Sequence, residues 1–195
     1  MSYGEFSRDF FGTVWLAWAI TWWVFARNVK ATVRQQAALP RRVNAALLFV
    51  AAALFWFPRL PLPVLYDRLL PAAQWPFWAS FGAALTLIGL LFTVWARIYL
   101  GRNWSGMAAT IKADHELITG GPYALVRHPI YSGLALAFVG SALAIGQWRG
   151  VLSVVLALLA IVHRMRVEER LMREQFGAAY DAYAQRVRAF IPGVV

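Results

Sequence analysis

The sequence contains no cysteine, which excludes disulfide bonds, thiolate nucleophiles and cysteine-ligated metals. Charged residues are also scarce, because they make up 14% of the chain where soluble domains have about 25%. Its histidines, His115, His128 and His163, are too few and too scattered to predict a zinc site, and we expect no metal. Composition alone therefore argues against a soluble globular enzyme.

Three motifs of common enzyme classes are also missing from the sequence. There is no Ser-His-Asp pattern, no GxxxxGK[ST] and no GxGxxG after a strand. Hydrolysis by a triad, P-loop phosphoryl transfer and Rossmann cofactor binding lose support for this reason. The chemistry that remains depends mainly on positioning and on exclusion of water.

Apolar residues make up 61% of the 195 residues, and the 10 tryptophans are typical of chains that meet membrane interfaces. Five apolar runs stand out, and they lack the alternation of barrel strands. We therefore expect an all-α integral membrane protein, a single domain over residues 1–195 with five transmembrane helices. The predicted spans are residues 11–26, 43–57, 77–100, 130–148 and 151–163.

The basic residues predict the orientation of these spans. With five spans, residues 27–42, 100–129 and the C-terminal tail share one side, and with Arg97 that side holds 15 of the 19 Lys and Arg residues. By the positive-inside rule this side is cytoplasmic, so the N-terminus lies outside and the C-terminus inside. The pattern and the lack of cysteine fit a bacterial inner membrane. Residues 58–76 carry five prolines and are expected to form an external loop with a short turn near Val64 to Leu70.

Polar aromatic residues and imidazoles cluster around a Gly-Gly-Pro turn at residues 120–122, just before the fourth span. We interpret them as the lining of a cytosolic ligand pocket: His115, Tyr123, Arg127, His128 and Tyr131. In the competing interpretation the two tyrosines belong to the interfacial aromatic belt and Arg127 is a topology charge.

The segment from His163 to Phe190 is predicted to continue the fifth span as a cytoplasmic helix. Arg164 and Glu168 are four residues apart and share one face where the helix leaves the membrane, whereas Glu169 lies about 100° away. They form either a functional pair or an ordinary surface ion pair. The same helix carries an aromatic stripe typical of packing: Phe176, Tyr180 and Tyr183.

Several motifs occur together in the second half of the chain. They are GPYALVRHPIY before a span, an Arg-xxx-Glu-Glu helix, FGAAYDAY and a closing Ile-Pro. In this order they resemble the isoprenylcysteine carboxyl methyltransferase family and the related phospholipid methyltransferases, small membrane enzymes that use S-adenosylmethionine. The resemblance covers about Phe92 to Val195, and the first two spans match only in being spans.

The resemblance implies a cofactor pocket on the cytoplasmic side, with S-adenosyl-L-methionine as methyl donor and S-adenosyl-L-homocysteine as product. The positions implied to bind the cofactor are His115, Glu116, Leu117, Ile118, Tyr123, His128, Pro129, Ile130, Tyr131 and Glu168. Arg164 is implied to bind substrate, and Arg164 and Glu168 are the expected catalytic residues. Ala108 or Ala109 stands where some members place a glutamine.

The function expected from this resemblance is methyl transfer to a lipophilic or membrane-delivered acceptor, such as an isoprenylcysteine-type carboxylate. A phospholipid amine and a small thiol remain open as acceptors, and so does a non-catalytic scaffold of the same fold. The expected partners are the lipophilic substrate and membrane lipids, and no nucleic acid, since the net charge of +10 is explained by orientation.

Overall fold

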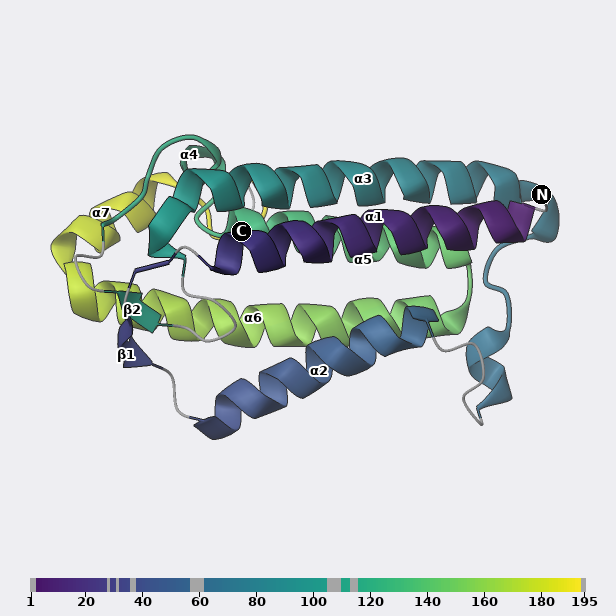
Figure 1. Ribbon diagram of the computed structural model, residues 1–195, viewed down its shortest axis with the longest axis horizontal. Coiled ribbons are helices and arrows are strands. Elements are labelled where there is room, and N and C mark those ends of the chain that lie inside the picture. The colour runs from purple at the N-terminus through teal and green to yellow at the C-terminus, as the bar shows by residue number, and fades with distance from the viewer. Residues whose placement is uncertain are drawn as a thin grey trace.

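The structure is a computed structural model that describes residues 3–27, 29–30, 32–35, 38–56, 62–104, 110–112 and 116–193. Its long helices are α1 (Tyr3–Ala26), α2 (Ala38–Trp56), α3 (Trp75–Leu100), α5 (Pro129–Ile145) and α6 (Trp148–Phe176). The short helices are η1 (Pro63–Tyr66), η2 (Ala72–Gln74), η3 (Gly101–Asn103), α4 (Pro122–Leu125) and α7 (Ala178–Arg186). Figure 1 shows the long helices lying along the long axis of the molecule, with α2 inclined to the others.

The long helices coincide with the five apolar runs. Among the described residues, Asp9–Ala26, Trp75–Asn103 and Trp148–Phe176 are long and apolar enough to cross a membrane, and α5 is a shorter apolar helix. The predicted continuation of the fifth run is confirmed as far as Phe176, because α6 runs unbroken to that residue. Its extension to Phe190 is wrong, since Gly177 adopts a φ of 50° and ends α6, so that Tyr180 and Tyr183 lie on the separate helix α7. The fourth run ends earlier than predicted, since Gly146 adopts the left-handed conformation with a φ of 61° and terminates α5.

One departure from the all-α expectation lies in the polar connections. Strand β1 (Thr32–Gln35) pairs with strand β2 (Thr110–Lys112) in an antiparallel ladder that joins Thr32 to Lys112 and Gln35 to Thr110. The all-α class is confirmed, and this short strand pair is an addition that the sequence does not predict. Both strands contain β-branched residues, but they lie far apart in the sequence and no hairpin turn links them, so no local signal predicts the pairing.

The connections gather at the two ends of the bundle. The expected external loop contains η1 and η2, and its backbone bonds the turn between α5 and α6, where Leu69 N–H donates to the Gly146 carbonyl at 2.9 Å. At the opposite end lie α4, α7 and the strand pair (Figure 1). The segments that the charge pattern places on one side are therefore at one end of the molecule.

Helices α3 and α5 make the closest contact of the bundle. A methyl group at Gly89 would lie 2.5 Å from the Gly133 carbonyl oxygen, and one at Gly140 would lie 2.5 Å from the Gly82 carbonyl oxygen. Glycine is required at these positions because the backbones themselves touch. This rigid pair holds the start of α5, which carries much of the functional site.

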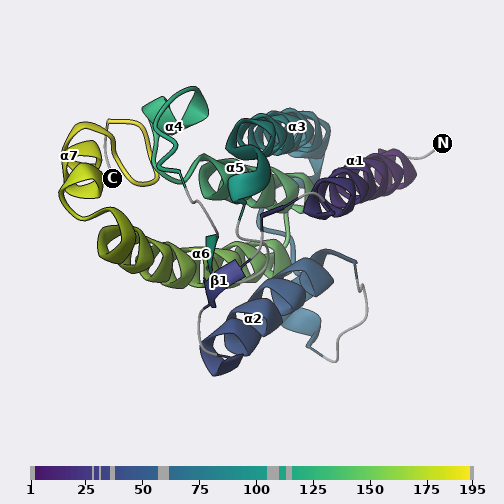
Figure 2. The ribbon, with the colours of Figure 1, turned by 60° about the vertical axis from the view of Figure 1, so that its left-hand side comes forward.

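Helix α1 is joined to this pair by two tryptophan side chains. The indole Nε1 of Trp15 donates to Ser141 Oγ at 3.1 Å, and that of Trp18 donates to Thr93 Oγ1 at 2.7 Å. The guanidinium of Arg97 ties the end of α1 to the end of α3, since Nη2 donates to the Phe25 carbonyl at 2.6 Å. Figure 2 shows α1 beside α3 and α2 beside α6, with α5 between the two pairs.

Candidate active site

One cavity of about 580 Å³ opens between α1, α2, α5, α6 and the loops at one end of the bundle. Its two ends differ in chemistry. The polar end is lined by charged, amide and phenol side chains: Asn103, Glu116, Tyr123, Arg127, His128, Tyr131, Arg164, Glu168, Tyr180 and Tyr183. The other end is lined by aromatic and aliphatic side chains from the first two helices and the core: Trp15, Trp18, Trp22, Leu48, Ala52, Leu134, Phe138 and Ile161.

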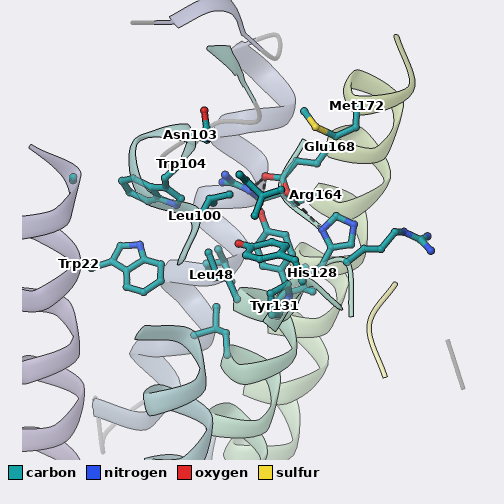
Figure 3. A pocket seen from close by; sticks show the side chains of 18 of the residues that line it. Trp22, Leu48, Leu100, Asn103, Trp104, His128, Tyr131, Arg164, Glu168 and Met172 are labelled. Atoms are coloured by element: carbon teal, nitrogen blue, oxygen red, sulfur yellow. Dashed lines mark hydrogen bonds and ion pairs between the residues drawn. The ribbon is translucent and has the colours of Figure 1, made fainter. Parts of the chain in front are cut away.

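The carboxylate of Glu168 is the centre of the first polar cluster (Figure 3). Its Oε1 accepts hydrogen bonds from the Tyr131 hydroxyl at 2.7 Å and from Arg164 Nε at 3.0 Å, and its Oε2 lies 3.8 Å from His128 Nδ1. The Arg164 and Glu168 side chains are 10% and 18% exposed. The alternative of a surface ion pair is therefore wrong, because this pair lines a cavity and is largely removed from water.

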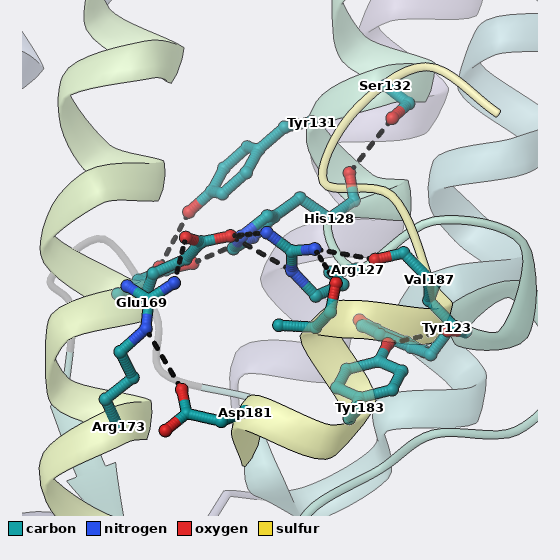
Figure 4. A network of polar contacts seen from close by, with 12 residues as sticks. Tyr123, Arg127, His128, Tyr131, Ser132, Glu169, Arg173, Asp181, Tyr183 and Val187 are labelled. Atoms are coloured by element: carbon teal, nitrogen blue, oxygen red, sulfur yellow. Dashed lines mark hydrogen bonds and ion pairs between the residues drawn. The ribbon is translucent and has the colours of Figure 1, made fainter. Parts of the chain in front are cut away.

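The neighbouring carboxylate, Glu169, is the centre of a second cluster on the other side of the histidine (Figure 4). It accepts from Arg127 through Nε at 3.1 Å and Nη2 at 2.5 Å, and it lies 3.4 Å from His128 Nε2. Arg173 Nη2 donates to its second oxygen at 3.3 Å. His128 thus lies between two adjacent glutamates, each of which faces a different ring nitrogen.

The end of the chain holds this histidine turn in place. The backbone N–H groups of Arg127 and His128 donate to the carbonyls of Arg188 and Ala189 at 2.8 and 3.0 Å. The Ser132 hydroxyl donates to the carbonyl of Phe190 at 2.5 Å. The C-terminal segment therefore lies against the start of α5 and satisfies backbone donors that helix α5 cannot pair.

Burial raises the pKa of the tyrosines in the cavity wall. The Tyr183 hydroxyl donates to the Tyr123 carbonyl at 2.6 Å, and burial raises the pKa of both phenols. Burial, with the nearby charge of Glu169, raises the pKa of Tyr180 to about 12. These side chains stay protonated at neutral pH and act as hydrogen-bond donors.

Most residues named from the sequence meet at this cavity. Glu116, Leu117, Ile118, Tyr123, His128, Pro129, Ile130, Tyr131, Arg164 and Glu168 all line it. His115, Ala108 and Ala109 lie outside the described residues. The structure places these residues in the wall of the cavity. Their roles in binding the cofactor and the substrate stay predictions.

Arg127 also lines the cavity, as the pocket interpretation predicts. Tyr180 and Tyr183, which the sequence assigns to a packing stripe, line it too. Glu169 is not among the lining residues, and its angle of about 100° from Glu168 on the helix directs it to Arg127. Asn103 has an oxygen, Oδ1, that is buried without a hydrogen-bond partner among the described residues. In the sequence, the only signals for the second cluster, around Glu169, are that Glu169 follows Glu168 directly and that Arg127 precedes His128.

The cavity fits the cofactor that the motifs imply. Its volume falls within the roughly 300–1,000 Å³ of small-molecule sites. The Oδ1 of Asn103, which has no partner in the part of the chain that the structure describes, is a buried acceptor that an amino group of a ligand satisfies. The carboxylates of Glu116 and Glu168 are available to cationic groups. Apolar walls at Leu117 and Ile118 suit a heterocyclic base.

A helical bundle with membrane-length helices and a polar cavity at one end defines an integral membrane class of protein. Comparison with known proteins identifies that class, since residues 77–179 match the model of the phospholipid methyltransferase family. The chain belongs to this family. The match contains all but the first two residues of α3, all of α4, α5 and α6, and the first residues of α7, and so it includes both glutamate clusters.

Individual relatives agree with the family. Protein-S-isoprenylcysteine O-methyltransferase B of Arabidopsis thaliana is 29% identical over 127 residues, which cover 64% of each chain. A probable protein-S-isoprenylcysteine O-methyltransferase of Oryza sativa subsp. indica is 31% identical over 118 residues, 60% of this chain and 62% of its own. The nickel-cobalt-cadmium resistance protein NccN of Alcaligenes xylosoxydans xylosoxydans is 34% identical over 124 residues, 62% and 55% of the two chains. The chain covers less than two thirds of the length of each.

Proposed function

We propose that this protein is an S-adenosylmethionine-dependent methyltransferase that methylates a lipophilic acceptor at the membrane surface. The observation that supports this most directly is the cavity itself, in which a cluster of buried ionic groups adjoins an apolar compartment. A water-soluble substrate needs only the polar end. Both ends together suit a molecule with a polar reacting group and a hydrocarbon tail.

In this proposal the cofactor occupies the polar end. Glu168, His128, Tyr123, Tyr131, Glu116 and the apolar pair Leu117 and Ile118 hold it, with Pro129 and Ile130 fixing the turn. Its sulfonium supplies an activated methyl group, which needs no metal or acid to leave. The Tyr131 hydroxyl and Arg164 Nε fix the orientation of the Glu168 carboxylate by hydrogen bonds, so that it is placed before the ligand arrives.

The chain's own contribution to the rate is to hold the acceptor and exclude water. Arg164 lines the polar end within one helical turn of Ile161, which lines the apolar end, and a guanidinium at this place grips an anionic acceptor group in a fork. Such an acceptor is a poor nucleophile in water. Burial between α5, α6 and the tryptophans of α1 strips its hydration shell and sets it in line with the methyl group.

The guanidinium of Arg164 favours an anionic acceptor among the three chemical types, because it lines the cavity and offers a planar fork of donors that matches a carboxylate. An isoprenylcysteine-type carboxylate, as named for the plant relatives, is therefore our preferred acceptor. A phospholipid amine is the second candidate, because the matched family is named for phospholipids.

We further propose that all five long helices cross the membrane, with the polar end of the cavity in the cytoplasm, where the cofactor is made. The charge asymmetry of the connections supports this orientation, with the N-terminus outside and the C-terminus inside. In this arrangement residues 92–195 form the catalytic half of a single domain, and a bacterial inner membrane is the expected location.

Titration of S-adenosylmethionine and S-adenosylhomocysteine into the detergent-purified protein tests the proposal, followed by transfer of a labelled methyl group to acceptors. We expect micromolar binding that Glu168→Gln weakens at least about tenfold, since a charged hydrogen-bond partner is lost. Glu174→Gln, an exposed glutamate on the same helix, is the matched control and should bind like the original protein. Absence of binding in folded, monodisperse protein would favour the non-catalytic scaffold.

A further inference from the structure

Asn44 lies on the buried face of α2, at the start of the second predicted span. Its side chain is 6% exposed, and its Oδ1 is a buried acceptor with no hydrogen-bond partner in the part of the chain that the structure describes. An amide oxygen that is removed from water without a partner costs free energy, and a membrane span offers little water to replace one. Leucine has nearly the same size and would avoid this cost. We therefore expect this oxygen to gain its partner from a ligand.

The lining of the cavity shows that such a ligand can reach Asn44. Asn44, Leu48 and Ala52 all line the cavity, and because they are spaced four residues apart they form one stripe along α2. Leu48 packs against the core cluster that contains Phe138, and Figure 3 shows it among the side chains around the cavity. Asn44 is the polar member of this stripe and stands one turn from Leu48, towards the polar end.

A contact between α2 and α6 gives the height of Asn44 relative to Arg164. Ser153 Oγ donates to the Ala51 carbonyl at 2.5 Å, so these two residues lie at the same level of helices that run in opposite directions (Figure 1). Asn44 precedes Ala51 by about two turns, and Ala160 follows Ser153 by about two turns, so Asn44 lies near the level of Ala160. Arg164 is one turn further along α6, about 6 Å closer to the polar end.

This position separates Asn44 from the residues proposed to hold the cofactor. Those residues come from the segment 116–118, from the turn before α5, from the start of α5 and from α6, and none of them is on α2. Asn103, a cavity asparagine whose Oδ1 also lacks a partner among the described residues, donates through Nδ2 to Glu116 at 3.5 Å and so belongs to the cofactor end. The ligand group that reaches Asn44 is therefore part of the acceptor whose anionic group Arg164 binds.

The step of one turn between Arg164 and Asn44 limits the place of this donor in the acceptor. The nitrogen of an amide on the carbon next to a carboxylate lies about 2.5 Å from the carboxylate carbon, and its hydrogen bond adds about 2.9 Å. Together these lengths span roughly 5 Å, which matches the step along the helices. An acylated amino acid has this arrangement, whereas a carboxylate without a neighbouring donor leaves Oδ1 unpaired.

We propose that Asn44 is a specificity-determining residue, whose Oδ1 accepts a hydrogen bond from an amide N–H that the acceptor carries next to its reacting carboxylate. The proposal rests on the proposed function, because it takes Arg164 as the site of that carboxylate. It names N-acylated amino acids with an apolar side chain as the acceptor class. It also gives α2, which lies outside the matched residues 77–179, a part in substrate choice.

The test compares two acceptors that differ in one atom. N-acetylcysteine with an S-linked isoprenoid tail carries the amide N–H, and the matching ester, in which oxygen replaces that nitrogen, keeps the carboxylate and the size but has no donor. We expect the original protein to show a kcat/KM at least about tenfold higher for the amide, because the ester leaves Oδ1 unpaired. In Asn44→Leu the ratio should fall below about threefold, since neither compound then faces a buried acceptor. Phe49→Leu, on the outer face of α2 where Phe49 is 71% exposed, is the control and should keep the original ratio.

Affinity and stability separate this role of Asn44 from two others. Asn44→Leu should bind S-adenosylmethionine within about twofold of the original protein and, without ligand, should unfold at the same or a higher temperature, since an unsatisfied buried group is removed. A loss of cofactor affinity of about tenfold would assign Oδ1 to the cofactor, and a lower unfolding temperature would assign it to the fold. Either result would overturn the proposal.

The comparison of amide and ester in the original protein needs no variant to fold. Equal turnover of the two compounds would overturn the role of Asn44 and leave the proposed function intact. Methyl transfer to neither compound, although the cofactor binds, would count against the proposed function, and the role of Asn44 would fall with it.

Discussion

Arg127 and Glu169 form an ion pair in which Nε and Nη2 of the guanidinium both donate to the same carboxylate oxygen, at 3.1 and 2.5 Å. The third nitrogen of Arg127 donates to the carbonyls of Ala184 and Val187 at 3.1 and 2.6 Å. Burial lowers the pKa of Arg127, but the hydrogen bonds and charge of Glu169 more than offset this and raise it. One side chain thus joins α6, the turn before α5 and the C-terminal segment.

Replacing Glu169 should therefore disturb the histidine turn without touching the ligand directly. In Glu169→Gln the buried guanidinium of Arg127 loses its counter-charge, and we expect a loss of about 3 kcal/mol in the free energy of unfolding. His128 Nε2 then faces a neutral amide in place of a carboxylate, so the histidine turn is held less firmly and cofactor affinity should fall as well. Thermal unfolding in detergent and cofactor titration measure the two effects.

Arg173→Gln is the matched control for this change. Arg173 also bonds Glu169, but its side chain is 48% exposed, and an exposed ion pair contributes less than about 1 kcal/mol. Unfolding temperature and affinity should stay near those of the original protein. Equal stability of Glu169→Gln and Arg173→Gln would contradict the structural role of the Arg127 ion pair.

Much of this site could be predicted from the sequence, for reasons of periodicity. Arg164 and Glu168 are four residues apart on a helix, so their shared face followed from 3.6 residues per turn, and the structure confirms it. The contacts of Glu169 are harder to predict, because the sequence gives its position on the helix but not its partner. Arg127 and Glu169 are 42 residues apart, and only tertiary packing brings them together.

The same limit explains the rest of the fold. Apolar runs predict helices well, since each run follows from hydrophobicity alone. The pairing of β1 with β2 and the bond of Arg127 N–H to the Arg188 carbonyl depend on where loops meet after the bundle has formed. Burial is likewise invisible in the sequence, and it is what separates the ion pair at Arg164 from a surface pair.

The α3–α5 contact predicts a strong effect of a single methyl group. In Gly140→Ala the new carbon would lie 2.5 Å from the Gly82 carbonyl oxygen and 2.6 Å from Thr86 N, so the helices must separate. We expect a loss of about 1–3 kcal/mol in the free energy of unfolding, as for other overpacked cores. Denaturation in detergent micelles measures it.

Gly12→Ala supplies the comparison, because this glycine is also helical but has only ordinary contacts at 3.5 Å with Trp56. Alanine has the higher helix propensity, so stability should be unchanged or rise by up to about 1 kcal/mol. If both variants lost stability equally, close backbone contact would not be the reason for glycine at position 140.

The buried bond between two cavity tyrosines predicts a smaller loss. Tyr183→Phe removes the hydroxyl that donates to the Tyr123 carbonyl at 2.6 Å and leaves that carbonyl unsatisfied. We expect a loss of about 1–3 kcal/mol in unfolding free energy, with the loop before α5 loosened. Hydrogen exchange at residues 120–128 should rise more than exchange in α3. Uniform protection across both regions would show that the bond does not hold this loop.

The role of Arg164 is best separated from that of Glu168 by a conservative change. Arg164→Lys keeps the charge, but a lysine offers a single ammonium in place of a planar fork and cannot bond Glu168 and an acceptor in the same geometry. Cofactor affinity should change less than about threefold, because the Tyr131 hydroxyl still donates to Glu168, whereas kcat should fall about tenfold or more. Arg166→Lys, at an exposed neighbouring position, is the control and should match the original enzyme in both quantities.

A loss of cofactor affinity as large as the loss of kcat in Arg164→Lys would show that Arg164 serves the cofactor and not the acceptor. Alanine at position 164 extends the same series, since it removes both charge and fork and should lower kcat further while the cofactor still binds.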